Sequence, residues 1–146
     1  MDGEARQILL VDDELGVLDI LQVNLEAEGY TIHAARDGVE ALEKARALRP
    51  DLIILDLMMP RMDGWEVLGR LEADRRTAGT PVIILSVRAE EASIVQGLEQ
   101  GALEYFTKPF DPVVVSRTVR MMLEEMDTRG RQVYRHSLIE RRRSMK

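Results

Sequence analysis

The sequence predicts an α/β fold: a doubly wound, five-stranded parallel sheet with five helices. Short apolar runs alternate along residues 7–126 with segments whose apolar residues recur at helical spacing. The run Leu52–Leu55 is apolar at every position, which is typical of a strand buried on both faces of a parallel sheet. Strands that alternate with helices form sheets of this kind, and the helices cover both faces.

Five short runs are the expected strands, and most of them are rich in branched apolar side chains, which favour extended structure. The expected strands are Gln7–Val11, Thr31–Ala35, Leu52–Leu55, Thr80–Leu85 and Leu103–Phe106. A helical segment separates each run from the next, as parallel crossovers require.

The helical segments lie between residues that start and stop helices. Asp37, with Glu40 three residues later, matches a capping box, and Pro112 suits a first helical turn. Gly29 and Gly101 suit helix ends in the left-handed conformation. The expected helices are Leu15–Glu28, one that starts after Asp37, Trp65–Asp74, Glu90–Gln100, and one opened by Asp111 or Pro112.

Polar residues gather where the expected strands end. Asp12 and Asp13 follow the first strand, and Asp56 ends the third. Ser86 follows the fourth strand, and Lys108 lies just beyond the fifth. Parallel geometry brings the carboxyl ends of all strands to one edge of the sheet, where open α/β folds place their sites. The sequence therefore predicts three carboxylates, one hydroxyl and one ammonium at this edge.

This set of groups suits phosphoryl chemistry on a hard cation. Three adjacent carboxylates repel one another, and a divalent ion relieves that repulsion. An all-oxygen set without sulfur favours Mg²⁺, with Mn²⁺ as a second choice. Lys108 and Ser86 could then contact phosphoryl oxygens, which leaves the Asp56 carboxylate as a candidate nucleophile.

The composition fits one globular domain. The chain has 146 residues, 45% of them hydrophobic, which is enough for a core. It has no cysteine, which excludes disulfides and thiolate metal sites. We see neither an apolar run of membrane length nor a signal peptide, so we expect a cytoplasmic location and no membrane partner.

The charge divides the chain into two parts, residues 1–126 as the main domain and residues 127–146 as a basic C-terminal tail or helical extension. Residues 127–146 carry seven basic and two acidic side chains, a net charge of +5, so residues 1–126 carry −11 of the total of −6. The basic part could be a solvated tail, or a helix continuing from the last one and packing on its own body or on a second copy. The acidic body argues against direct nucleic-acid binding.

Four motifs in order along the chain resemble those of response-regulator receiver domains. They are Ile8–Glu14, Leu55–Pro60 followed by Asp63 and Gly64, Ile84–Ser86, and Tyr105–Phe110. The resemblance covers residues 7 to about 126. It implies a flavodoxin-like sheet with strand order 2-1-3-4-5.

The resemblance also implies a role for each site residue. Asp56 would be the phosphoacceptor. Asp13 and Asp56 would bind Mg²⁺ directly, Asp12 would act through water, and Met58 would offer its backbone carbonyl.

Three further residues are assigned to the switch and its surroundings by the same resemblance. Ser86 and Lys108 would contact the phosphoryl group, and Tyr105 would swing inward when Ser86 moves. The Lys108–Pro109 peptide bond would be cis.

A receiver domain would be a phosphorylation-switched module of a two-component system. A histidine kinase or phosphotransfer protein would supply the phosphoryl group. The face around the fourth helix, fifth strand and fifth helix would then control a downstream protein target or a missing output domain. The domain would assist its own phosphorylation and dephosphorylation without being an enzyme for other substrates. The sequence leaves open whether it forms a homodimer.

Two other functions remain open at this stage. Phosphatases with an aspartyl nucleophile carry a second acid two residues after the nucleophile, where this chain has Met58. A flavin or nucleotide binder of the same fold needs a Gly- or Ser/Thr-rich phosphate loop after the first strand. This chain has Asp12, Asp13 and Glu14 there, which would repel phosphate in the absence of a metal.

Overall fold

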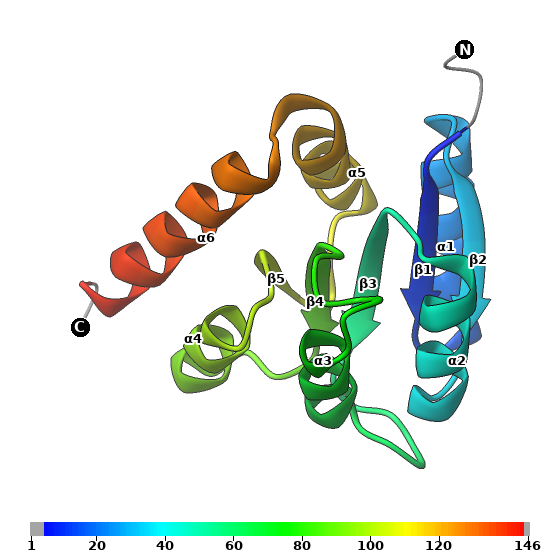
Figure 1. Cartoon of the computed structure of the whole chain (residues 1–146), viewed down its shortest axis with the longest axis horizontal. Coiled ribbons are helices and arrows are strands. Elements are labelled where there is room, and N and C mark those ends of the chain that lie inside the picture. Colours follow the sequence, from blue (N-terminus) through cyan, green and yellow to red (C-terminus); the bar gives the residue numbers. More distant parts are fainter. Residues whose placement is uncertain (1–4, 145–146) are drawn as a thin grey trace.

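The computed structural model describes residues 5–144, and its centre is a five-stranded parallel sheet (Figure 1). The strands are β1 (Gln7–Val11), β2 (Thr31–Ala35), β3 (Leu52–Asp56), β4 (Val82–Ser86) and β5 (Glu104–Thr107). Their order is β2-β1-β3-β4-β5, and every neighbouring pair is parallel. The predicted fold class and strand order are confirmed.

Helices cover both faces of this sheet. They are α1 (Leu15–Ala27), α2 (Gly38–Leu48), α3 (Gly64–Ala73), α4 (Glu91–Glu99), α5 (Pro112–Arg120) and α6 (Thr128–Arg143). A π-helical segment, η1 (Met121–Glu125), continues α5. Helices α1 and α5 pack on one face, and α2, α3 and α4 pack on the other. No helix within the described range combines the length and the apolar character that a membrane span requires.

The alternation of side chains along each strand builds both cores. In β1, Leu9 and Val11 belong to the core under α2, α3 and α4, whereas Ile8 and Leu10 belong to the core under α1 and α5. All residues of β3 and β4 are buried. Because the middle of the sheet is closed on both faces, polar groups of these strands can reach solvent only at the strand ends.

Aspartate side chains cap the starts of α2, α3 and α5. The carboxylate of Asp37 accepts the Glu40 N–H at 2.9 Å, and Asp63 accepts the Glu66 N–H at 3.0 Å. Asp111 accepts the N–H of Val113. Each bond satisfies a backbone donor that has no partner inside its helix.

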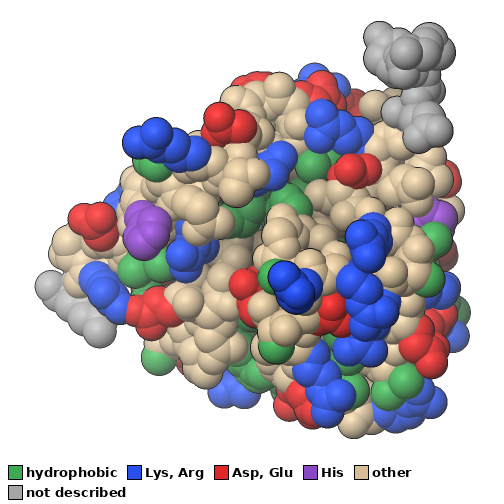
Figure 2. Space-filling view, viewed as in Figure 1, with side chains coloured by type: hydrophobic (Ala, Val, Ile, Leu, Met, Phe, Trp, Pro, Cys, Tyr) green, Lys and Arg blue, Asp and Glu red, His purple; other side chains and the backbone are tan. Residues whose placement is uncertain are grey.

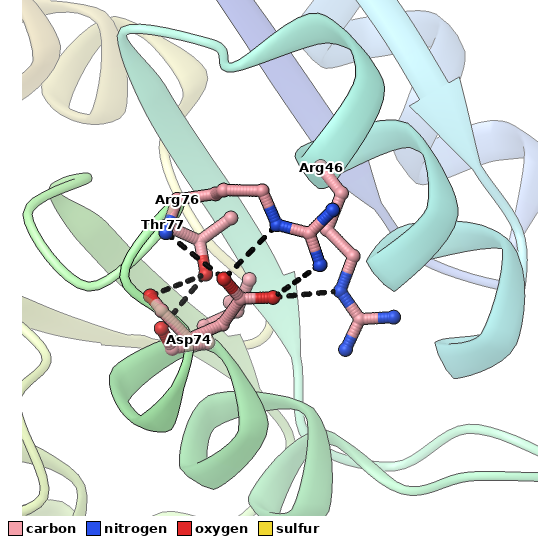
Figure 3. Close-up of polar contacts among 5 residues, drawn as sticks. Arg46, Asp74, Arg76 and Thr77 are labelled. Atoms are coloured by element: carbon pink, nitrogen blue, oxygen red, sulfur yellow. Dashed lines mark hydrogen bonds and ion pairs between the residues drawn. The ribbon is translucent and has the colours of Figure 1, made fainter.

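The end of α3 is tied to α2 through one carboxylate (Figure 3). Asp74 accepts hydrogen bonds from the guanidinium groups of Arg76 and Arg46. These bonds, those to Arg76 first, hold the pKa of Asp74 well below its usual range. The Thr77 hydroxyl donates to the Leu71 carbonyl at 2.8 Å, which closes the turn after α3.

The structure corrects two expectations drawn from the sequence. The fourth strand begins at Val82 rather than Thr80. Pro81 has no N–H to donate to a neighbouring strand, although its carbonyl accepts the Ile53 N–H just before β4 begins. Residues 5–144 also form six α-helices instead of the expected five. Residues 128–143 do not continue the preceding helix, because the backbone is extended at Met126 and the Asp127 carboxylate caps a new helix at Gly130 N–H.

Helix α6 packs back on the body of the chain, against α4 (Figure 1). Ile139 joins the core under α4, whereas Tyr134 packs against the core on the opposite face, so α6 spans the edge of the sheet. Arg142 pairs with Glu91 at 2.6 Å, and Arg143 pairs with Glu99. Figure 2 shows basic and acidic side chains next to one another where α6 meets α4.

Replacing Ile139 by alanine should lower the free energy of unfolding by about 2 kcal/mol, because a side chain only 7% exposed leaves a cavity against α4. Val133 lies on the same helix and is 63% exposed, so Val133→Ala should change stability by less than about 0.5 kcal/mol. Urea unfolding of both variants measures the difference. Equal effects would contradict the docking of α6.

Candidate functional site

Three carboxylates meet where β1 and β3 end. Asp12 follows β1, Asp56 is the last residue of β3, and both are 2% exposed. Asp13 lies beside them and is half-buried. One oxygen from each of the three side chains lies within 4.8 Å of the others. The structure therefore brings together the three acids that the sequence places at this edge.

A close backbone approach fixes the loop after β3. The Gly64 N–H donates to the Leu57 carbonyl at 2.9 Å. A Cβ atom on Gly64 would lie 2.4 Å from the Asp56 backbone oxygen, closer than side chains can approach. Only glycine fits here, and its small size lets the start of α3 hold the residues around Asp56 in place.

Lys108 supplies the positive charge at the same edge. Its Nζ lies 2.9 Å from Asp12 Oδ2, 2.9 Å from Glu14 Oε1 and 3.4 Å from Asp56 Oδ2. Burial lowers the pKa of Lys108, but the nearby Glu14, Asp12 and Asp56 together outweigh burial and raise that pKa above its usual value. The side chain therefore stays an ammonium ion among the carboxylates.

One buried oxygen in this cluster lacks a hydrogen bond. Asp12 Oδ1 accepts the Glu14 N–H at 2.9 Å. Asp12 Oδ2 is buried and lies near Lys108 Nζ, but the geometry of that contact is not that of a hydrogen bond, and within residues 5–144 this oxygen has no other partner. The nearby ammonium offsets part of the cost of burying this oxygen. Three carboxylate oxygens within 4.8 Å of one another still form an all-oxygen donor set, which fits a hard divalent cation.

The pKa of the Asp56 carboxylate differs from its ordinary value. Burial is the largest cause, and with the charge of Asp12 it raises the pKa of Asp56 to about 6. The Met58 N–H, which donates to Oδ1 at 3.1 Å, and the charge of Lys108 act in the opposite direction. Perturbed carboxylates of this kind are common at functional sites.

A hydroxyl and an aromatic ring lie next to the cluster. Ser86 is fully buried at the end of β4, and its Oγ accepts the Arg88 N–H at 3.1 Å. A hydroxyl whose oxygen accepts a bond keeps its own hydrogen as a donor. Tyr105 is buried, and its hydroxyl donates to the Arg88 carbonyl at 2.6 Å. The aromatic side chain thus lies inward in this structure. The peptide bond between Lys108 and Pro109 is cis.

Comparison with known proteins identifies the family. The family model of the response regulator receiver domain matches residues 8–120. The chain therefore belongs to the response regulator receiver domain family. Receiver domains are signalling modules of two-component systems, so this assignment replaces the phosphatase and flavin-binding alternatives.

Relatives of this receiver domain include two transcription regulators. The DNA-binding dual master transcriptional regulator RpaA of Synechocystis sp. is 41% identical over 133 residues, which cover 91% of this chain and 55% of RpaA. The alkaline phosphatase synthesis transcriptional regulatory protein PhoP of Bacillus subtilis is 43% identical over 122 residues, which cover 84% of this chain and 50% of PhoP. The chain spans about half the length of these relatives.

A solved structure of similar size is the phosphorylated cyanobacterial phytochrome response regulator RcpA. It is 29% identical to this receiver domain, and the TM-score is 0.75. The match covers 85% of this chain and 98% of that one.

The structure adds one residue to the site of this receiver domain, and the roles expected of the site residues stay predictions. Glu14 was not assigned a role from the sequence, yet its carboxylate holds Lys108 at 2.9 Å. The sequence signal for Glu14 was its position as the third of three consecutive acidic residues. For Met58 the structure gives the N–H bond to Asp56, and the side chain is exposed, so its carbonyl as a metal ligand stays a prediction.

In metal-free buffer, Asp56→Asn should raise the free energy of unfolding at pH 7 by about 2 kcal/mol, because a pKa raised by about two units means that the ionised form destabilises the folded chain. This destabilisation is present above pH 6 and disappears as the pH falls from 6 towards 4. The gap between parent and variant should therefore shrink when urea unfolding is repeated at pH 5. A gap that is absent at pH 7, or unchanged at pH 5, would contradict the assignment of a strained carboxylate.

Proposed function

We propose that this receiver domain accepts a phosphoryl group on Asp56 from the phosphohistidine of a histidine kinase or phosphotransfer protein. The observation that carries the proposal is the position of Asp56 at the end of the central strand, within 3.4 Å of the Lys108 ammonium and inside a cluster of carboxylates. The similarity to RcpA, a response regulator whose phosphorylated form has been solved, supports it.

The acidic cluster is the proposed metal site. Asp13 and Asp56 would bind Mg²⁺ directly, Asp12 would act through a water molecule, and the Met58 carbonyl would complete the protein ligands. Bound Mg²⁺, or Mn²⁺ in its place, would neutralise the carboxylates and the incoming phosphoryl oxygens. The close approach of the three carboxylates, with one oxygen of each within 4.8 Å of the others, supports this assignment.

In the proposed phosphoryl transfer, each side chain of the site has a separate role. A carboxylate oxygen of Asp56 attacks the phosphorus atom, the P–N bond to the donor imidazole breaks, and its electron pair leaves with the imidazole nitrogen. Lys108 balances charge on the transferred group, and the Ser86 hydroxyl donates a hydrogen bond to it. Attack of water on the same phosphorus breaks its bond to the Asp56 oxygen, releases inorganic phosphate and restores the carboxylate. The domain thus assists its own phosphorylation and dephosphorylation.

The transferred group would act on the face formed by α4, β5 and α5. We propose that Ser86 moves towards the phosphoryl group and that Tyr105 takes its inward position in response. Residues 1–126 would be the receiver unit, working in the cytoplasm, and residues 127–146 a helical extension. Because RpaA is a DNA-binding regulator about twice as long, the output would lie in a protein target or in a further domain.

Incubation with acetyl phosphate and Mg²⁺ should add one phosphoryl mass to the parent chain and none to Asp56→Asn, because the amide cannot act as the acceptor. Asp63→Asn is the matched control: this acid lies on the same loop but caps α3, and the variant should gain the mass. Intact-mass spectrometry measures both. Stoichiometric labelling of the Asp56→Asn variant would refute the assignment.

Asp13→Ala should weaken Mg²⁺ binding by about tenfold or more, since the site has few protein ligands. Asp19→Ala removes an exposed acid from α1 and should leave the affinity within about twofold. Isothermal titration with Mg²⁺ compares them. Equal affinities in the parent and Asp13→Ala would remove Asp13 from the ligand set.

Lys108→Ala should still take phosphate from acetyl phosphate, but slowly, and should not pass the change on to Tyr105. Intact-mass spectrometry follows the phosphorylation, and the NMR signals of the tyrosine ring follow the switch. A variant that is phosphorylated and shows the same change in the Tyr105 signals as the parent would contradict the role of Lys108.

A further inference from the structure

Helix α6 covers part of the face that carries the proposed switch. It packs against α4, where the Arg135 guanidinium donates to the Leu98 carbonyl at 2.7 Å. It also reaches β5, where the Tyr134 hydroxyl donates to Glu104 Oε2 at 2.5 Å. A segment of the chain itself therefore lies where receivers are expected to bind a target.

Four hydrogen bonds, linked through the covalent frames of Arg88, Tyr105 and Glu104, lead from the proposed phosphorylation site to α6. This series begins at Ser86, whose Oγ accepts the Arg88 N–H, and the Arg88 carbonyl in turn accepts the Tyr105 hydroxyl. The Tyr105 N–H donates to Glu104 Oε1 at 3.0 Å. The other oxygen of the same carboxylate accepts the hydroxyl of Tyr134.

The Glu104 carboxylate is the junction of this series. One of its oxygens accepts the backbone N–H of Tyr105 in β5, and the other accepts the Tyr134 hydroxyl of α6. Burial, and then the hydrogen bond to Glu104, raise the pKa of Tyr134 above its usual value, so its hydroxyl keeps the proton that it donates. We therefore expect a shift of β5 at Tyr105 to alter the Glu104–Tyr134 bond that holds α6.

The inward ring of Tyr105 also supports α4 directly. At Gly97 of α4, a Cβ atom would lie 2.7 Å from Ile84 Cδ1 and 3.2 Å from Tyr105 Cδ2, so the helix touches the ring with no room for a side chain. Helix α6 packs on this same α4. In this structure α6 is docked and Tyr105 lies inward. Both α6 and Tyr105 contact helix α4, and both are hydrogen-bonded to the Glu104 carboxylate.

We propose that α6 is the intramolecular partner of the switch and docks on the form in which Tyr105 lies inward. The inference rests on the proposed function, in which phosphorylation of Asp56 favours that form. Phosphorylation then strengthens the docking of α6, and by thermodynamic reciprocity docked α6 favours the phosphorylated form. The first structural response to phosphorylation would then be the tighter docking of α6, before any second molecule binds.

Hydrogen exchange of the full-length chain tests this coupling. The chain is incubated in Mg²⁺ with and without acetyl phosphate, and backbone exchange is measured over residues 128–143 by mass spectrometry. Phosphorylation should slow exchange in this segment by about fivefold or more, the usual lower range of coupling between two sites. Intact mass, recorded on the same samples, reports how much of the chain is phosphorylated.

Two phenylalanine variants separate coupling from general stability. Tyr134→Phe keeps the ring but removes the bond to Glu104, so it should still be phosphorylated but should lose most of the slowing. Tyr30→Phe removes a similar bond, at 2.6 Å to Glu124, that lies off the path, and it should respond as the parent does.

The outcomes distinguish failure of the coupling from failure of the site. A parent chain that gains the phosphoryl mass while α6 exchanges at the same rate or faster overturns the coupling and leaves the phosphoacceptor assignment intact. A parent chain that gains no mass overturns the proposed function and the coupling with it. An equal loss of slowing in both phenylalanine variants also overturns the proposed path.

Discussion

The mutual repulsion of three carboxylates is the constraint on which this structure depends. Asp12, Asp13 and Asp56 are held together because parallel pairing of β1 and β3 ends both strands at one edge. The Lys108 ammonium partly offsets their charge. Burial and the charge of Asp12 still raise the pKa of Asp56, so the offset is incomplete. A site with this residual imbalance responds strongly to an added cation or phosphoryl group, as a switch must.

The fold and most of the site could be predicted from the sequence because both follow from local patterns. Leu52–Leu55 identified the central strand by its composition, and Asp37 identified the start of α2 by its capping spacing. The five site residues at the strand ends followed from one rule of parallel sheets. The role of Glu14 did not follow, because it depends on which way one exposed side chain turns towards Lys108.

The path of the chain after α5 could not be predicted from local sequence patterns. A helix continuing from α5 was one expectation for residues 127–146, but the break before α6 depends on the cap at Asp127. The direction of α6 depends on distant partners such as Glu104, 30 residues away from Tyr134. Contacts of this kind leave no periodic trace in the sequence. The same long-range contacts join α6 to β5 and α4, which is why they matter for the output of the domain.

The order in which the site's charges appear along the chain has a consequence for its synthesis. All three carboxylates belong to the first 56 residues of the sequence, whereas Lys108 follows Asp56 by 52 positions. Domains form progressively as the chain leaves the ribosome. The nascent chain therefore carries the complete acidic set before its own counter-charge has been made. At that stage Lys108 cannot offset these acids, whereas cations from the surrounding solution can.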